Sequence, residues 1–350
     1  MLYYISYKKV TEVFTVKKIA FVFPGYGCAH AGMGKDVCDY SAECAEIYKK
    51  GSEALGIDAA AVSSKGKAAE VTDPEVSFQL QMLHELCLVK AAEDILPAPE
   101  AFIGYSAGEI TAMTAGEVFS TEDGMVAANA YKEMRKASLG AGKLDTYRLR
   151  NVKHEFVSLA SDKVMSGFVQ MTAVEAPEQT VLIGDEDGLK AVLTELAKHK
   201  VQPVKLRDSL PLHSMMVFPY VAKLQDALRP LTHNKLSVNL YSTLYGKLVD
   251  NMILPSDYFA KQQVNAIRFY EAASAAVKDG FDVFVVLGKD KDIAAALKKI
   301  AGDDNVFIAD SVADLKKISE KVKLDPPAEE PAEQPAEEKP ADEAKSEENK

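Results

Sequence analysis

The chain has 350 residues, enough for one large domain or two smaller ones, and its formal net charge is −11. Residues 325–350 hold ten acidic residues and three lysines, so they contribute −7 and the rest of the chain is only mildly acidic. No basic stripe is present, which argues against nucleic acid as a partner. No apolar run reaches the length of a transmembrane helix, and charges interrupt residues 1–18 where a signal peptide needs an apolar core. We therefore expect a soluble, cytoplasmic protein with no membrane partner.

The cysteines do not follow the spacing of a metal site. The closest pair in sequence is Cys38 and Cys44, and five intervening residues are too many for a zinc-binding pair. Reduced thiols fit a cytoplasmic protein. The sequence therefore predicts no bound metal.

The first part of the chain predicts a buried strand followed by a glycine-rich loop. Residues 1–17 are expected to be an extension that precedes the fold. The apolar run at 18–23 is typical of a strand buried on both faces in a parallel sheet. The loop at 24–36 matches neither the dinucleotide-binding fingerprint nor a P-loop, so nucleotide binding is not expected.

A serine motif lies at the centre of the predicted fold. An apolar strand at 101–103 runs into Gly104-Tyr105-Ser106-Ala107-Gly108, and a helix follows. The two glycines leave room for a tight turn that exposes the serine hydroxyl. A serine at a helix N-terminus lies where free N–H groups and the helix dipole favour negative charge. The motif therefore predicts a nucleophile at Ser106.

Helices and strands alternate through the first part of the chain. The apolar spacing predicts helices at 38–55 and 76–95, and a capping sequence at 120–123 predicts a further helix at 122–137. This alternation indicates a parallel sheet with helices on both faces, which places the chain in the α/β class.

The pattern changes after residue 138. Residues 139–207 are predicted to form a small α+β subdomain, inserted in a large α/β domain made of 18–138 and 208–323. The elements expected in the subdomain are strands at 166–174, 180–183 and 201–206 and a helix at 186–200. Residues 324–350 repeat Pro, Ala and Glu, a composition that predicts a disordered acidic tail.

Three motifs resemble those of the acyl-CoA:acyl-carrier-protein transacylase family, which includes malonyl transacylases and the acyltransferase domains of polyketide synthases. They are Phe23-Pro24-Gly25 with Gly27, the turn at Ser106, and Leu212-His213-Ser214 with Met216. Two later segments support the resemblance, Gln263-Val264-Asn265 and Val286-Leu287-Gly288.

The resemblance covers about 18–320 and implies a large α/β-hydrolase-like domain carrying a small ferredoxin-like one. The small domain is expected to be abbreviated, because Val174 and Thr180 are too close in sequence to leave room for its first crossover helix.

The resemblance also implies a Ser-His dyad. A serine hydroxyl does not ionise alone at neutral pH, so a neighbouring imidazole must take its proton. Among six histidines, His213 matches the base of the family, and His30 is the one rival considered. No aspartate can be assigned as a third member.

Further site residues follow from the same resemblance. The family orients its histidine through a backbone carbonyl, and Asn265 occupies the matching place. The backbone N–H groups of Tyr26 and Ala107 are expected to form the oxyanion hole.

The expected acyl pocket departs from that of malonyl-selective members. Tyr131 stands where those members carry an arginine, and a tyrosine cannot replace the charge or the fork of a guanidinium. Leu212 precedes the histidine, at a position where malonyl-selective members carry an aromatic residue or a serine. Ser77 falls where the family has a pocket glutamine. Arg135 lies one helical turn after Tyr131 and either reaches inward or is solvated. We therefore expect an uncharged acyl group rather than malonyl.

The resemblance, together with these residues, predicts an enzyme that moves an acyl group from acyl-CoA, its substrate, to an acyl carrier protein through an acyl-Ser106 ester. One alternative is a hydrolase of the same fold that strips acyl groups from carrier proteins, and another is a non-catalytic docking subunit. No tightly bound cofactor is expected. Carrier proteins of this kind are acidic, so basic residues are expected around the mouth of the site, with Lys132, Arg135, Lys136 and 148–153 as candidates. The sequence leaves the oligomeric state open.

Overall fold

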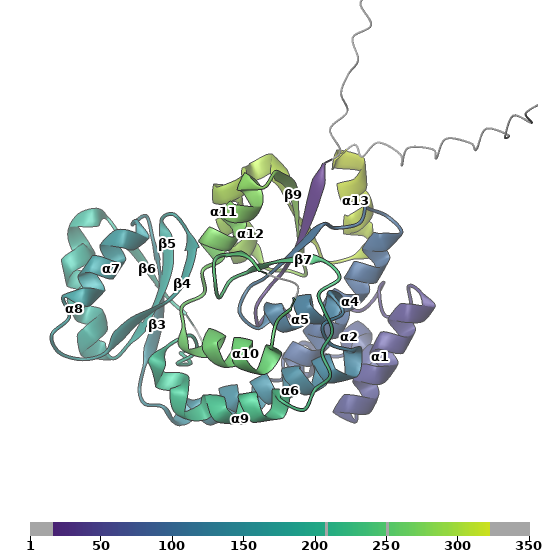
Figure 1. The fold of residues 1–350 in the computed structure, drawn as a ribbon, viewed down its shortest axis with the longest axis horizontal. Helices are drawn as coiled ribbons and strands as arrows, with labels where there is room; N and C mark the ends of the chain where they lie inside the picture. Colours follow the sequence, from purple (N-terminus) through teal and green to yellow (C-terminus); the bar gives the residue numbers. More distant parts are fainter. Residues whose placement is uncertain (1–16, 207–208, 250–251, 323–350) are drawn as a thin grey trace, which may run out of the picture.

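A sheet forms the centre of the large domain (Figure 1). It has six strands, in the order β10-β9-β1-β2-β7-β8. The computed structural model describes residues 17–206, 209–249 and 252–322. Nearly all of the predicted extension and all of the predicted tail therefore lie outside the described residues. The strands are β1 (Lys18–Phe23), β2 (Ala101–Gly104), β7 (Asn239–Ser242), β8 (Lys247–Leu248), β9 (Phe281–Leu287) and β10 (Val306–Ala309).

All strand pairs of this sheet are parallel except the pair of β7 with the short β8. In β1, Ile19, Phe21 and Phe23 face one hydrophobic cluster, whereas Ala20 and Val22 face another. Since successive side chains of a strand point to opposite faces, β1 is buried on both sides. The prediction of an α/β fold with a parallel sheet is confirmed.

Helices cover both faces of the sheet (Figure 1). The first face is covered mainly by α1 (Ala42–Leu55), α4 (Ser77–Glu93), α5 (Gly108–Ala115) and α6 (Thr121–Ala137). The second face is covered by α11 (Phe269–Lys278) and α12 (Lys291–Ala301). The other helices of this domain are α2 (Ala59–Lys65), α3 (Ala68–Val71), α9 (Phe218–Leu228), α10 (Pro255–Val264) and α13 (Val312–Val322).

Local sequence explains where several of these helices begin and end. Ser41 caps α1 by accepting a hydrogen bond from the backbone of Cys44, and Gly56 ends the helix with φ 67°. Ser120 caps α6 in the same way. Almost all of α4 is buried, including its polar residues, which makes it the central helix of the first face.

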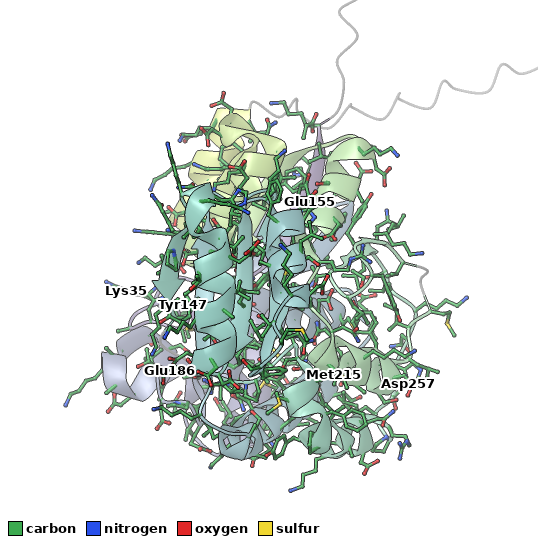
Figure 2. The ribbon with its side chains drawn as sticks, turned by 90° about the vertical axis from the view of Figure 1, so that its left-hand side faces the viewer. Lys35, Tyr147, Glu155, Glu186, Met215 and Asp257 are labelled. Atoms are coloured by element: carbon green, nitrogen blue, oxygen red, sulfur yellow. The ribbon has the colours of Figure 1, made fainter. Side chains whose placement is uncertain are left out.

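The small domain has the complete ferredoxin-like order of elements. They are β3 (Asp145–Arg150), α7 (His154–Asp162), β4 (Val169–Ala176), β5 (Gln179–Gly184), α8 (Glu186–Leu196) and β6 (Gln202–Lys205). The strands pair antiparallel in the order β4-β5-β3-β6. Figure 2 looks onto this domain, with Tyr147 on β3, Glu155 on α7 and Glu186 on α8.

The expected abbreviation of the small domain is therefore wrong. The first crossover helix is α7, which lies before β4, whereas Val174 and Thr180 belong to the two strands of a tight hairpin. The sequence analysis did not predict β3 because its residues, DTYRLR, are mostly polar and only Thr146 and Leu149 are buried. Because no strand was predicted before α7, this segment could not be identified as the first crossover helix.

The two domains are joined by backbone hydrogen bonds as well as by the chain. Val174 of β4 donates to Ile267, which in turn donates to Thr172. The backbone N–H of Met215, in the short 3-10 helix Met215–Val217, donates to Gln170 of β4 at 2.9 Å. Within the residues described, no helix is long and apolar enough to cross a lipid bilayer.

Candidate active site

The serine motif folds as a sharp turn between β2 and α5. Ser106 has φ 56°, a left-handed conformation that non-glycine residues adopt uncommonly. A Cβ on Gly104 would lie 2.4 Å from Cα of Glu109, and one on Gly108 would lie 2.2 Å from the carbonyl oxygen of Phe23. Both positions therefore require glycine, as the motif predicted.

Ser106 lies in direct contact with His213. The distance between Ser106 Oγ and His213 Nε2 is 2.6 Å, and His213 Nδ1 lies 3.0 Å from the carbonyl oxygen of Gln262. A carbonyl can only accept, so Nδ1 carries the proton and Nε2 accepts from the serine hydroxyl. Burial lowers the pKa of His213 to about 4, so the imidazole is neutral at neutral pH. This arrangement can pass the serine proton to the imidazole.

The carbonyl that orients His213 belongs to Gln262, so the expectation for Asn265 is wrong. The side-chain amide of Asn265 is exposed and donates to the carbonyl of Lys261. Helix α10 ends at Val264, and the last turn of a helix has carbonyls without partners inside the helix. Gln262 lies in that turn, and Asn265 is the capping residue just after it, whose backbone N–H donates to the same Gln262 carbonyl at 3.3 Å.

The two expected oxyanion donors come from two different segments. Ala107 immediately precedes α5, and Tyr26 lies in the loop after β1. Gln81 of α4 holds this loop, since its Nε2 donates to the carbonyl of Gly25 and its Oε1 accepts from the N–H of Cys28, both at 2.9 Å. The sequence analysis missed Gln81, although a glutamine within a buried helical run is a signal that a partner is required.

A cavity of about 240 Å³ opens beside the dyad, between the two domains. Tyr26, Tyr131, Arg135 and Leu212 line it together with Ser106 and His213. The small domain adds the lining residues Arg148, Thr172, Glu175 and Val181, and the segment after β9 adds Asp290 and Ile293.

Ser77 does not line this cavity, so its assignment to the pocket is wrong. It is buried behind Tyr26, and its hydroxyl lies 3.3 Å from the phenol oxygen of Tyr26. Arg135 reaches inward, with its guanidinium over the Tyr26 ring at 3.8 Å from the ring centre. Tyr26 therefore contacts Ser77 through its hydroxyl and Arg135 through the face of its ring.

The wall of the small domain carries a buried ion pair that the sequence analysis did not assign. Arg148 donates from Nε and Nη2 to the carboxylate of Glu175 at 2.8 and 3.0 Å, and from Nη1 to Asp292. The hydroxyl of Tyr105, next to the nucleophile, donates to Glu175 at 2.8 Å. The charge of Arg148 is thus balanced by two carboxylates.

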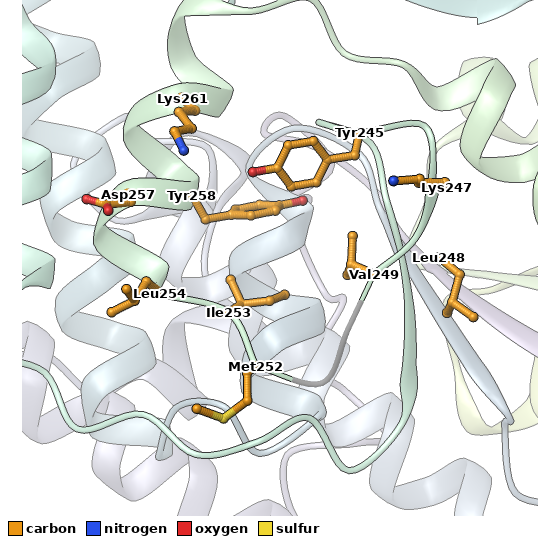
Figure 3. A pocket seen from close by; sticks show the side chains of 10 residues that line it. All are labelled: Tyr245, Lys247, Leu248, Val249, Met252, Ile253, Leu254, Asp257, Tyr258 and Lys261. Atoms are coloured by element: carbon orange, nitrogen blue, oxygen red, sulfur yellow. The ribbon is translucent and has the colours of Figure 1, made fainter.

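A larger cavity, of about 450 Å³, lies next to α10 (Figure 3). Tyr245, Met252, Tyr258 and Lys261 are among its lining residues, and Figure 3 shows the rings of Tyr245 and Tyr258 side by side. Neither Ser106 nor His213 lines this cavity. The candidate site is therefore placed by the dyad and not by cavity size.

Comparison with known proteins places this geometry in a family. The acyl transferase domain family matches residues 20–317. The malonyl CoA-acyl carrier protein transacylase of Bacillus subtilis is 23% identical over 289 residues, 81% of this chain and 91% of that protein. The polyketide synthase GfsE of Streptomyces halstedii is 26% identical over 283 residues, which are 77% of this chain and 7% of the synthase.

Solved structures share the fold. The malonyl CoA-acyl carrier protein transacylase from Clostridium perfringens superposes with a TM-score of 0.81 at 23% identity, over 87% of this chain and 97% of that one. A malonyl-transacylase solved in complex with its type II polyketide synthase acyl-carrier protein superposes with a TM-score of 0.77 at 18% identity, over 87% and 99%. The resemblance inferred from the motifs is confirmed, and the chain belongs to the acyl transferase domain family, a family of acyltransferases.

Proposed function

We propose that the protein is an acyl-carrier-protein S-acyltransferase that works through an acyl ester of Ser106. The observation that carries the proposal is the distance of 2.6 Å between the Ser106 hydroxyl and the neutral, buried Nε2 of His213. The names of relatives support the class of acceptor, since they include transacylases that act on acyl carrier protein. No tightly bound cofactor has a place in this proposal, because the dyad supplies the chemistry.

The proposed reaction has two similar halves. Ser106 Oγ attacks the thioester carbonyl of acyl-CoA while His213 Nε2 takes its proton, and the N–H groups of Tyr26 and Ala107 bind the oxyanion. When the intermediate collapses, the C–S bond breaks and His213 returns the proton to the leaving CoA thiolate. The phosphopantetheine thiol of the carrier protein then loses its proton to His213 and attacks the ester. The C–O bond to Ser106 then breaks and His213 returns the proton to Ser106 Oγ, so that the new thioester and the free serine hydroxyl form together.

We propose that the acyl group is uncharged. Tyr131 lines the cavity at 2% exposure, and burial raises the pKa of its phenol to about 12, so it stays neutral. Arg148 already holds two carboxylates, and Arg135 lies over the ring of Tyr26. A malonyl carboxylate would need a charge-assisted hydrogen-bond partner in the cavity. Malonyl-selective relatives place an arginine there, whereas this chain has the neutral phenol of Tyr131.

The fate of the acyl group tests the proposal. The protein is incubated with labelled butyryl-CoA and a holo carrier protein. The label is then measured in acylated carrier protein, in free butyric acid and in unreacted butyryl-CoA. We expect labelled, acylated carrier protein with the wild-type enzyme and none with His213→Ala. Free acid formed equally with and without the carrier would instead indicate the hydrolase, and unreacted thioester across a panel of acyl-CoAs would indicate the docking subunit.

A further inference from the structure

Glu109 is a buried carboxylate that the proposed reaction does not use. It lies in the first turn of α5, three residues after Ser106, and it is fully buried. In the described part of the chain no lysine or arginine forms an ion pair with it. A buried carboxylate without a cation is costly, and it is retained only where hydrogen bonds stabilise it.

The hydrogen bonds to Glu109 come from donors on two other segments. Oε1 accepts from the backbone N–H of Thr243 at 2.6 Å, and the hydroxyl of Thr243 lies 3.0 Å away. Oε2 accepts from the Tyr258 hydroxyl at 2.8 Å and from the Gln262 side-chain amide at 2.6 Å. Both oxygens thus face N–H or O–H groups, which is the arrangement that an ionised carboxylate requires.

Gln262 connects this carboxylate to both members of the dyad. Its Nε2 donates one hydrogen to Glu109 and the other to the backbone carbonyl of Ser106 at 3.0 Å. Its own backbone carbonyl accepts a hydrogen bond from the Nδ1–H of His213. The side chain that Glu109 holds therefore belongs to the residue that orients the imidazole.

We propose that Glu109 is a positioning residue for acyl transfer, which fixes Gln262 and supplies, through it, the negative charge that an aspartate supplies in a Ser-His-Asp triad. The inference rests on the proposed function of the dyad. When His213 takes the serine proton it becomes an imidazolium, and the buried carboxylate of Glu109, linked to it through Gln262, stabilises that charge.

The charge state of Glu109 makes the inference testable by pH. Burial outweighs the hydrogen bonds from Thr243, Tyr258 and Gln262 and raises the pKa of Glu109 to about 7. The titratable groups that face it are Tyr258, from α10, and His213, through Gln262. Tyr258 stays neutral, since burial raises its pKa well above the usual value. Transfer should therefore rise with pH as Glu109 ionises, with a midpoint near 7.

The experiment compares pH profiles of kcat and KM for the wild type, Glu109→Gln, Tyr258→Phe and Glu117→Gln. Glu117 is exposed just after the same helix and serves as the matched control. Glu109→Gln should lower kcat about 10- to 100-fold, as expected for an outer hydrogen-bond partner of the reacting group, with KM within about twofold and no step near pH 7. Tyr258→Phe removes one donor from the carboxylate, so it should move the step to higher pH. Glu117→Gln should match the wild type.

Other outcomes overturn the inference. If Glu109→Gln melts at a lower temperature but keeps the kcat profile of the wild type, Glu109 is only part of the folded scaffold. If Glu109→Gln fails to fold, Tyr258→Phe decides, because an unshifted step would exclude Glu109 as its source. If Ser106→Ala also retains transfer, the proposed function itself fails, which separates the two claims.

Discussion

His213 Nδ1 lies 3.0 Å from the carbonyl oxygen of Gln262, and this contact sets the protonation of the whole site. Because a carbonyl cannot donate, the proton stays on Nδ1 and leaves Nε2 free to accept from Ser106. The base therefore needs no carboxylate in direct contact to hold the correct tautomer.

The first prediction concerns the titration of His213. Burial lowers its pKa to about 4, so nitrogen-15 NMR should show a neutral ring protonated on Nδ1 from about pH 5 upward. A histidine with a lowered folded pKa destabilises the fold in acid, because the unfolded chain takes up a proton at a higher pH. The free energy of unfolding should thus fall as pH drops from about 6.5 towards 4, and less so in His213→Gln. An imidazole that titrates near 6.5 would contradict the geometry.

The second prediction concerns His30, which pairs with Asp310 at 3.0 Å and has its other ring nitrogen 3.0 Å from the carbonyl of Cys28. Both partners are acceptors, so the protonated ring fits best, and the hydrogen bond to Asp310 raises the pKa of His30. Its stabilisation is complete below about pH 6.5 and is lost as pH rises through the raised pKa.

Chemical denaturation at several pH values tests this pair. His30→Asn should cost about 1 kcal/mol at pH 6 and progressively less at higher pH. The exposed His233→Asn is the control and should show no such trend. An equal cost at every pH would show that the ring acts without its charge.

The third prediction separates two buried glutamines of the same helix. Gln81 holds the loop of Tyr26 through two hydrogen bonds, whereas the side-chain N and O of Gln79 have no hydrogen-bond partner among the described residues. Gln81→Met should lower kcat about 10- to 100-fold, because an oxyanion donor moves with the loop. Gln79→Met should keep activity and leave the free energy of unfolding unchanged or higher. Steady-state kinetics and denaturation of both variants check the contrast, and equal kinetics would contradict the role of Gln81.

The fourth prediction concerns the turn that carries the nucleophile. Gly108→Ala places a Cβ 2.2 Å from a backbone oxygen of Phe23, so it should cost about 3 kcal/mol or more or prevent folding. Gly140→Ala meets nothing closer than 3.9 Å, at the Tyr220 hydroxyl, and should change stability by less than about 1 kcal/mol. Thermal unfolding of the pair measures the difference. Similar melting temperatures would mean that the turn relaxes around the extra methyl group.

The fifth prediction concerns acyl selectivity. Tyr131→Arg introduces a guanidinium into the cavity and should raise loading from malonyl-CoA at least tenfold relative to butyryl-CoA. Tyr131→Phe is the control, since it changes the hydroxyl without adding charge. Unchanged malonyl loading in Tyr131→Arg would show that the wall near Leu212, rather than charge, sets selectivity.

The sequence predicted the parts of the site that depend on side-chain motifs. Ser106 was predicted from its Gly-x-Ser-x-Gly turn and His213 from its match to a motif of the transacylase family, and the structure brings their side chains within 2.6 Å. Gln262 was missed because its orienting group is a backbone carbonyl, which every residue has. Gln81 was missed because its role depends on the loop opposite it, a contact between residues 56 positions apart.

The fold shows the same division. The strand β1 was predicted from a continuous apolar run, since it is buried on both faces. The strand β3 was missed because it is largely half-buried and carries two arginines, both of which pair with Asp292 of α12 across the domain interface. This segment is a strand because it pairs with β5 on one side and β6 on the other, and neither contact can be read from its own residues.

The central claim, an acyl ester on Ser106, is tested most directly by the mass of the intact protein after brief incubation with a panel of acyl-CoAs. The account predicts that most of the wild-type protein gains the mass of one uncharged acyl group. A much smaller fraction should gain the mass of a malonyl group, and Ser106→Ala should gain neither. An adduct of the same mass on Ser106→Ala would contradict the assignment of the nucleophile. A malonyl adduct that forms fastest would contradict the proposed selectivity and leave the dyad in place.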